Sequence, residues 1–165
     1  MMIGVFTAEL DDSYQAAAWE GISARAEREK IGLICFLGSR LNSPVVPEKS
    51  ANRIYDLANE NSLEGLIVIS SAISTYLEID DLRRFLTARC SSPLVSIGSQ
   101  VPGVPSVTVA GREGLTAVVQ HLIDEHERGC FGLIMGPEGH AEAEERKAAF
   151  YDTLRANRID FDARL

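Results

Sequence analysis

Carboxylates gather near the start of the chain, where an apolar run gives way to a helical pattern. The stretch FTAELDDSYQAAAWEGI places three acids and then two hydroxyl side chains there, namely Glu9, Asp11, Asp12, Ser13 and Tyr14. Acids in such a place can hold a metal ion, belong to a phosphorylation site, cap a helix or line a pocket for a polar ligand. The rest of the sequence decides between these chemistries.

Phosphoryl transfer is the first chemistry to test. A response-regulator receiver carries acids after its first strand to hold Mg²⁺, and it needs a further aspartate at the end of its third strand. Here the third apolar run ends in Ser70 and Ser71, and no lysine follows the later runs VSIGSQ and VTVAGR. The sequence therefore argues against a receiver, and we predict no metal site.

Other catalytic motifs are missing from the sequence. No GxGxxG follows the first apolar run, no GxxxxGK[ST] occurs, and there is no GxSxG elbow. His121, His126 and His140 do not have the HExxH spacing of a zinc site. We predict no catalytic residue and no cofactor.

Two interpretations of the opening acids remain. Asp12 or Ser13 can cap the helix that follows, because their short oxygens reach free N–H groups in its first turn. Capping needs only one residue, however, and the neighbouring polar side chains also suit hydrogen bonding to a polar ligand, with Tyr14 offering an apolar face. Capping alone and capping combined with ligand contact both stay open on these residues.

Short apolar runs alternate with amphipathic stretches along the chain. The runs are Ile3–Phe6, Leu33–Phe36, Leu66–Ile69, Leu94–Ile97, Val107–Val109 and Phe131–Met135. Helical periodicity appears around Trp19–Ala26, Ala51–Ala58, Ile79–Leu86, Leu115–Leu122 and Glu142–Asn157. Continuous apolar strands between helices are typical of a buried parallel sheet. We predict an α/β fold with a doubly wound, flavodoxin-like first lobe and the beginning of a second α/β lobe.

The alternation of apolar runs and helical patterns is interrupted once. Between Ile97 and Val107 the sequence GSQVPGVPS excludes a helix, so the chain reaches its fifth strand by a loop and leaves the first sheet near Ala110. The expected domains are a first lobe, 1–109, and an incomplete second lobe, 110–165. Because ligands of open parallel sheets bind at the carboxyl ends of the strands, we expect Asp12, Tyr14 and Ser70 to lie together there.

Composition narrows the choice of partners. The 165 residues carry a net charge of −8 and show no basic stripe, which argues against a nucleic-acid-binding surface. No apolar run approaches the roughly 20 residues of a membrane span, and MMIGVF is not a secretory signal. The widely spaced Cys35, Cys90 and Cys130 predict buried or half-buried free thiols in a reducing cytoplasm.

Seven stretches in order now point to a known family. They are IGVFTAELDDSYQAAAWEGI, EGLIVISS, PLVSIGS, VPSVTV, GREGLTAVVQHLI, FGLIMGP and EERKAAFYDTL. Together they resemble the effector-binding domain of the LacI/GalR regulators, which has the type I periplasmic-binding-protein fold. No single stretch is specific, but the ordered set covers nearly the whole chain.

The resemblance implies a set of ligand contacts. DDSYQ occupies the place of the family's ligand segment, so Asp12, Ser13 and Tyr14 match first-lobe contact positions, and Arg146 matches an effector-contacting arginine. The sequence departs from the family at Ala110-Gly111, where the family has an Asp-Asn pair. With the neighbouring acid and the two serines after the third strand, the candidate ligand-binding residues are Asp11, Asp12, Ser13, Tyr14, Ser70, Ser71 and Arg146.

The resemblance also implies a function. We expect a non-enzymatic ligand-sensing domain for a small polar molecule such as a sugar, signalling to an output domain that this chain does not contain. A LacI-like transcription regulator is one setting, and the sensor module of a histidine kinase or diguanylate cyclase is an alternative. A flavodoxin-like enzyme is a third. Because residues 110–165 would leave helices without a full sheet, we also expect a homo-dimer.

Overall fold

The computed structural model of the protein describes residues 1–59, 63–137 and 139–161. By its internal contacts the chain divides into two compact units, Met1–Thr108 and Val109–Leu165. We refer to them as unit 1 and unit 2.

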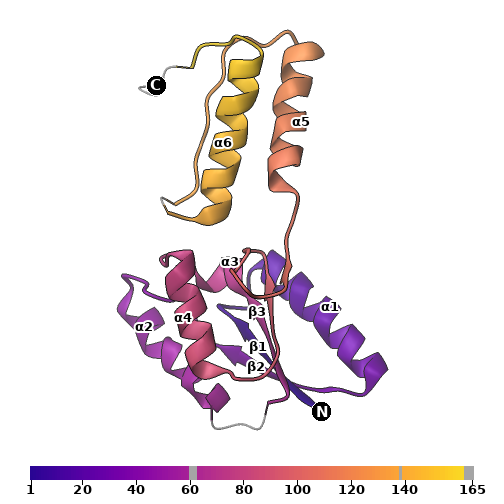
Figure 1. The fold of residues 1–165 in the computed structure, drawn as a ribbon, viewed down its shortest axis with the longest axis vertical. Coiled ribbons are helices and arrows are strands. Elements are labelled where there is room, and N and C mark those ends of the chain that lie inside the picture. Colours follow the sequence, from indigo (N-terminus) through magenta and orange to yellow (C-terminus); the bar gives the residue numbers. More distant parts are fainter. Residues whose placement is uncertain (60–62, 138, 162–165) are drawn as a thin grey trace. The chain divides into compact units, whose positions relative to one another are not determined.

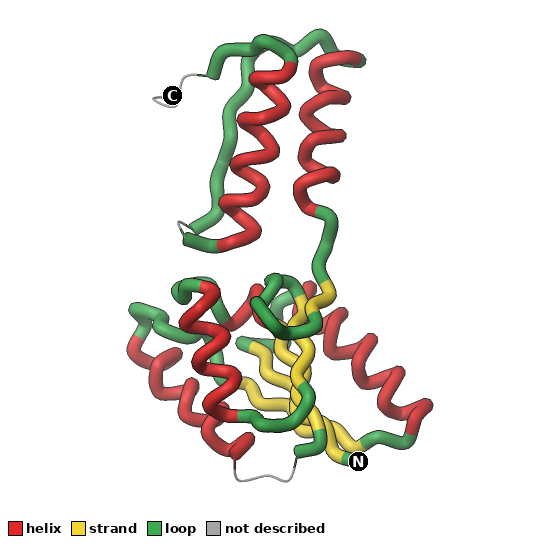
Figure 2. The backbone as a smooth tube through the Cα atoms, in the orientation of Figure 1, coloured by secondary structure: helices red, strands yellow, loops and turns green. Residues whose placement is uncertain are grey.

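Unit 1 is built on a parallel sheet, which has five strands in the described residues (Figure 2). The strands are β1 (Met2–Thr7), β2 (Gly32–Leu37), β3 (Gly65–Ile69), β4 (Leu94–Ile97) and β5 (Ser106–Val107). Their spatial order is β2-β1-β3-β4-β5. This is the flavodoxin-like order, so the α/β fold class predicted from the sequence is confirmed.

Helices cover both faces of the sheet (Figure 1). Helix α1 (Ser13–Glu29) lies on one face, and α2 (Val46–Ala51), the 3₁₀ helix η1 (Asn52–Asn59) and α4 (Ile79–Arg89) lie on the other. A four-residue helix, α3 (Ser70–Ile73), follows β3 directly. The helix expected around Ala51–Ala58 is therefore a short α-helix that continues as a 3₁₀ helix.

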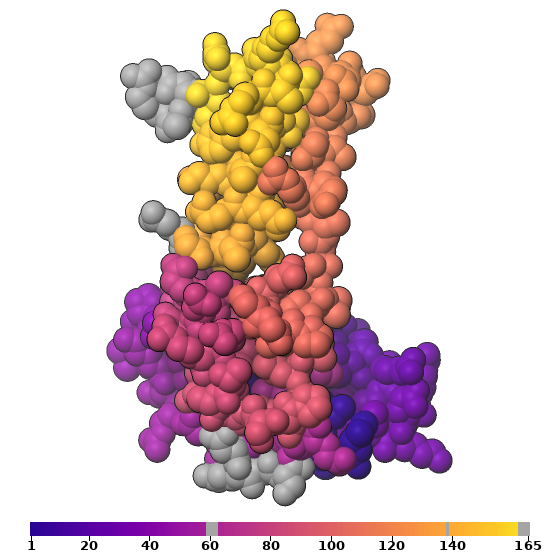
Figure 3. Space-filling view, in the orientation of Figure 1, coloured from indigo at the N-terminus to yellow at the C-terminus, as the bar shows by residue number. Residues whose placement is uncertain are grey.

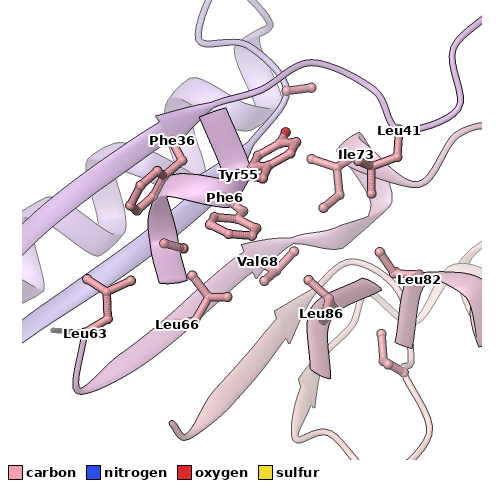
Figure 4. Packing of buried hydrophobic residues seen from close by; sticks show 13 residues of the cluster. Phe6, Phe36, Leu41, Tyr55, Leu63, Leu66, Val68, Ile73, Leu82 and Leu86 are labelled. Carbon is pink, nitrogen blue, oxygen red and sulfur yellow. The ribbon is translucent and has the colours of Figure 1, made fainter. Parts of the chain in front are cut away.

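The main core of unit 1 fills the space between the sheet and the η1–α4 layer (Figure 4). Tyr55 is completely buried there, with its ring 4.6 Å from that of Phe6 between centroids. Its hydroxyl donates toward two backbone carbonyls, of Thr7 at 2.9 Å and Ser39 at 2.8 Å. Burial raises the pKa of this phenol well above its ordinary value. Tyr55 thus ties the end of β1 and the loop after β2 to the core.

Unit 2 contains two long helices in its described residues, α5 (Gly111–Asp124) and α6 (Ala141–Ala156). The helices pack on each other, and their side chains meet in the space-filling view (Figure 3). The buried centre of this pair consists of Val119, Phe150 and Leu154. Unit 2 therefore has a much smaller core than unit 1.

The sequence predicts a strand over Phe131–Met135, and that prediction is wrong. The backbone there runs as an extended loop between α5 and α6 (Figure 2). A strand needs a neighbour to share its hydrogen bonds, and no described residue of unit 2 provides one. The side chains still alternate: Phe131 and Leu133 pack against the helices, and Ile134 is fully exposed.

Two further expectations from the sequence concern the cysteines and membrane-spanning helices. The cysteines are free thiols, but only Cys35 and Cys90 are half-buried, while Cys130 is exposed because it lies in the loop after α5. Burial raises the pKa of the Cys35 thiol above its ordinary value. In the described part of the chain, no helix is both long enough and apolar enough to cross a membrane.

Candidate functional site

The candidate site lies at the edge of the unit 1 sheet where the strands end. Strands β1 and β3 are neighbours, with Phe6 paired to Val68, so Thr7 and Ile69 end at the same edge. Strand β2 also ends there, since Thr7 pairs with Leu37. We call this the carboxyl edge; the loops that follow β1 to β4 emerge from it.

Asp12 is the N-cap of α1, as one of the sequence interpretations expects. It has extended backbone angles, φ −78° and ψ 129°, and its Oδ1 accepts from the backbone N–H of Gln15 at 3.0 Å. The cap uses one carboxylate oxygen, and the side chain is exposed. Capping is therefore established, and the second oxygen can still accept a hydrogen bond from a ligand.

Gln15 organises the acidic loop from inside. Its side chain is buried, and its Oε1 accepts three hydrogen bonds, from Thr7 Oγ1 at 2.7 Å and from the backbone N–H groups of Ala8 at 3.0 Å and Glu9 at 3.1 Å. This role leaves no signal in the sequence, because it depends on backbone groups whose direction only the folded loop sets. Gln15 holds the shape of the loop that carries the acids.

Asp11, Ser13 and Tyr14 are exposed at the same corner. Tyr14 shows 43% of its surface. Among the described residues, none offers a side-chain hydrogen bond to these three. The corner therefore presents a carboxylate, a hydroxyl and a phenol ring with free hydrogen-bonding capacity.

The two serines after β3 differ in exposure. Ser70 is completely buried, and its Oγ lies 2.6 Å from Ser96 Oγ, donates to the Ile97 carbonyl at 2.9 Å and accepts from Ser99 N–H at 3.0 Å. These bonds fix the turn after β4. Ser71 is half-buried. Ser70 thus belongs to the frame of the carboxyl edge, whereas Ser71 is closer to solvent.

The turn after β4 packs tightly on Ser71. Gly98 has φ +99°, and a Cβ built on it would lie 2.1 Å from Ser71 Oγ. Only glycine fits this position, because a side chain would meet both the unfavourable backbone angle and the serine. The close approach joins the ends of β3 and β4 into one surface.

Arg40 also lies at the carboxyl edge, and no motif in the sequence predicts it there. Its Nη2 lies 2.9 Å from Glu9 Oε1 and its Nη1 3.0 Å from Glu48 Oε1. Asn52 Nδ2 donates to the carbonyls of Gly38 at 2.6 Å and Arg40 at 3.1 Å, which anchors this loop. The adjacency of β1 and β2 creates the contact with Glu9, and a single arginine in a loop gives little sequence signal for it.

Arg146 lies on α6 in unit 2. Its Nη1 is 3.5 Å from Glu142 Oε2, one helical turn away, and 47% of its side chain is exposed. An exposed pair of this kind contributes little to stability. The guanidinium is therefore only weakly held within its own unit.

The chemistry of the carboxyl edge is that of hydrogen bonding. It offers carboxylates, hydroxyls and an aromatic ring, with the Arg40 charge already engaged by two acids. In the parts of the chain that the structure describes, no group of three or more His, Cys, Asp or Glu side chains is arranged to hold a metal ion. The site suits recognition of a polar molecule.

Comparison with known proteins gives the fold its context. No protein-family model matches the chain. No curated protein matches it either. Solved structures do match: a LacI family transcriptional regulator from Mycobacterium smegmatis superposes with a TM-score of 0.76 at 21% identity, over 98% of this chain and 54% of that one. The chain has the fold of the LacI-family regulators.

Further solved structures of this fold agree. The transcription regulator CcpA of Lactococcus lactis matches with a TM-score of 0.76 at 22% identity, over 99% of this chain and 56% of its own. The lac repressor dimer bound to operator and the anti-inducer ONPF matches with a TM-score of 0.73 at 23% identity, over 96% of this chain and 52% of its own. The resemblance to the LacI fold drawn from the sequence is confirmed, and the chain spans about half the length of these structures.

Proposed function

We propose that the protein is a ligand-sensing domain, with 1–109 as its first lobe and 110–165 as part of its second lobe. The observation that carries this proposal is the LacI-like fold, together with a carboxyl edge at which Asp11, Asp12, Ser13 and Tyr14 are exposed. Open parallel sheets bind their ligands at this edge. The function is recognition and not catalysis, and the setting is the cytoplasm.

The proposed ligand contacts form two groups. At the carboxyl edge they are Asp11, Asp12, Ser13, Tyr14 and Ser71, with Ser70 acting through the turn that it holds. Arg146 is the contact contributed by unit 2. Binding of a polyanion is disfavoured, because the acids at this edge are exposed and the nearby Arg40 is already paired with two other carboxylates. The ligand is therefore a neutral polyhydroxyl molecule, such as a sugar, or a zwitterion.

The proposed output is regulatory. Ligand binding would shift the population of conformations, and an output domain or a second copy would respond to that shift. The matching structures described above are those of transcription regulators, which favours DNA-linked output over a kinase or cyclase. Because these residues carry a net charge of −8, which DNA phosphates repel, any contact with DNA would have to come from other residues.

Calorimetry tests the ligand proposal. A panel of monosaccharides, amino acids and nucleosides is titrated into the chain, and the compound that binds is then titrated into Asp12→Asn. This substitution keeps a side chain that caps helices well and removes its charge. Charge-assisted hydrogen bonds are worth about 1.5–3 kcal/mol, so affinity should fall roughly tenfold to a hundredfold.

The matched control is Glu27→Gln, which removes an exposed charge near the other end of α1. It should bind the same compound as the parent does. The same compound is also titrated into Arg146→Met. If Asp12→Asn and Arg146→Met both retain full affinity, the acids are only a cap, the arginine is only a solvated charge, and the pocket lies elsewhere.

A further inference from the structure

A groove lies between the α2–η1 segment and α4, which lie side by side on the sheet face opposite α1 (Figure 1). We call it the η1–α4 groove. Its volume is about 290 Å³, and every residue that lines it lies between positions 41 and 89, so both of its walls belong to unit 1. None of the proposed ligand contacts at the carboxyl edge lines it. The groove is therefore distinct from the candidate site.

The α2–η1 wall carries two basic side chains without an acidic partner. Lys49 lies on α2 and Arg53 lies four residues later on η1, so both lie on the same side of the segment. Both residues are exposed, and among the described residues no carboxylate lies within ion-pair distance of either. Their positive charges are therefore available to a ligand in the groove.

The α4 wall adds a third basic side chain, which is held in place. Arg89 Nη2 and Nε lie 2.7 Å and 3.0 Å from Asp56 Oδ1 on the facing wall. The guanidinium also stacks on the Phe85 ring, 3.9 Å from its centroid. Arg89 Nη1 makes only a long contact, 3.5 Å from the Phe85 carbonyl, so it keeps donor capacity for a ligand.

The acidic side chains of the groove already have partners. Asp56 pairs with Arg89, and Asp81 pairs with Arg84, which does not line the groove. The unpaired charges that line the groove are thus on the α2–η1 wall, and both are positive. The groove is locally basic in a chain of net charge −8, and its preference is opposite to that of the acidic carboxyl edge.

We propose that the η1–α4 groove is a second ligand site and binds a small phosphate monoester. Such a group carries a charge of about −1.5 to −2 at pH 7, which the two unpaired cations balance, whereas a carboxylate carries a single charge. An arginine fork and a lysine ammonium both bind phosphate oxygens well. The volume is near the lower end for ligand pockets, so the rest of the molecule is small. Leu77 and Phe85 offer it apolar surface.

Two-dimensional NMR of the isotope-labelled chain tests the proposal, with glycerol phosphate as the probe and the ionic strength held constant with KCl. The amide signals of 49–56 and 81–89 should shift and saturate as the probe is added. Glycerate, which carries a carboxylate in place of the phosphate, should bind about tenfold more weakly because it has half the charge. Equal affinity for the two probes overturns the assignment to a phosphate.

Two variants test the residues. Lys49→Gln and Arg53→Gln each remove one unpaired charge and should weaken binding of glycerol phosphate about tenfold. Both positions are exposed, so the fold should not change, and unaltered signals from β1 and β3 check this. The matched control is Arg83→Gln, which removes an exposed positive charge of α4 outside the groove. It should bind within about twofold of the parent, because exposed charges at a distance are screened.

Three results overturn the proposal. The first is a parent chain whose signals do not shift and saturate with glycerol phosphate. The second is a phosphate affinity that neither Lys49→Gln nor Arg53→Gln weakens, since the contact then lies elsewhere. The third is an equal loss of affinity in all three variants, which would show a general attraction between charges and no defined site.

Discussion

Gln15 shows at the scale of a single residue how the candidate site is built. One buried amide oxygen receives three donors from the loop that carries Glu9, Asp11 and Asp12. The acids therefore lie on a loop whose backbone is held in place by hydrogen bonds to a buried side chain. A binding surface gains from such rigidity, because less conformational freedom is lost when a ligand binds.

Replacing Gln15 by leucine should destabilise unit 1. The substitution leaves the donors of Thr7, Ala8 and Glu9 without their acceptor, and unpaired buried groups cost about 1–3 kcal/mol. We expect the free energy of unfolding, measured by urea denaturation, to fall by roughly that amount. The control is Gln100→Leu at an exposed position, and an equal loss in both variants would contradict this role.

The sequence predicts some of these residue roles and misses others. Capping by Asp12 follows from its place before a helical pattern, because a cap is a local contact. The contact of Arg40 with Glu9 depends on two strands lying side by side, and the burial of Ser70 depends on β4 and its turn. Contacts between distant parts of the chain leave no trace in local spacing.

At the scale of elements, continuous apolar runs locate four strands of the sheet to within one residue and the fifth, β5, to within two. They succeed because a parallel strand is buried on both faces and needs no alternation. The same rule fails at Phe131–Met135, since an apolar run reports only the tendency to form a strand. Whether a neighbour exists to pair with is a property of the surrounding fold.

Phe150 is the largest side chain in the buried centre of the α5–α6 pair. Phe150 is buried and lies near the rings of Phe131, Tyr151 and Phe161. Phe150→Ala should therefore cost unit 2 about 3–5 kcal/mol, which is the usual loss for a buried phenylalanine. Because the core of unit 2 is small, its helices should lose most of their structure.

Amide hydrogen exchange measures this effect element by element. Exchange should become faster throughout α5 and α6 and stay unchanged in β1 and β3. Val118→Ala, on the exposed side of α5, is the control and should change little. Equal acceleration in both units would show that they unfold together, contrary to the separate cores described above.

At the scale of the whole molecule, charge decides what the chain can bind. Non-specific binding to DNA comes from cationic contacts with phosphates, and this chain carries 24 acidic against 16 basic side chains. We expect no mobility shift of a duplex DNA at about 0.15 M salt. A shifted band that weakens as salt is added would contradict this expectation and would require a basic surface.

The order of the strands has a consequence for how the chain is made. In the sequence β2-β1-β3-β4-β5, every strand after the first lies beside one that the ribosome has already released. The sheet can therefore grow outward from β1 during synthesis, first to one side and then to the other, without waiting for a later strand to fill a gap. Parallel sheets fold slowly because their pairings span long stretches of chain. Synthesis from the N-terminus relieves this delay, since each helix and strand that emerges finds its neighbour in place.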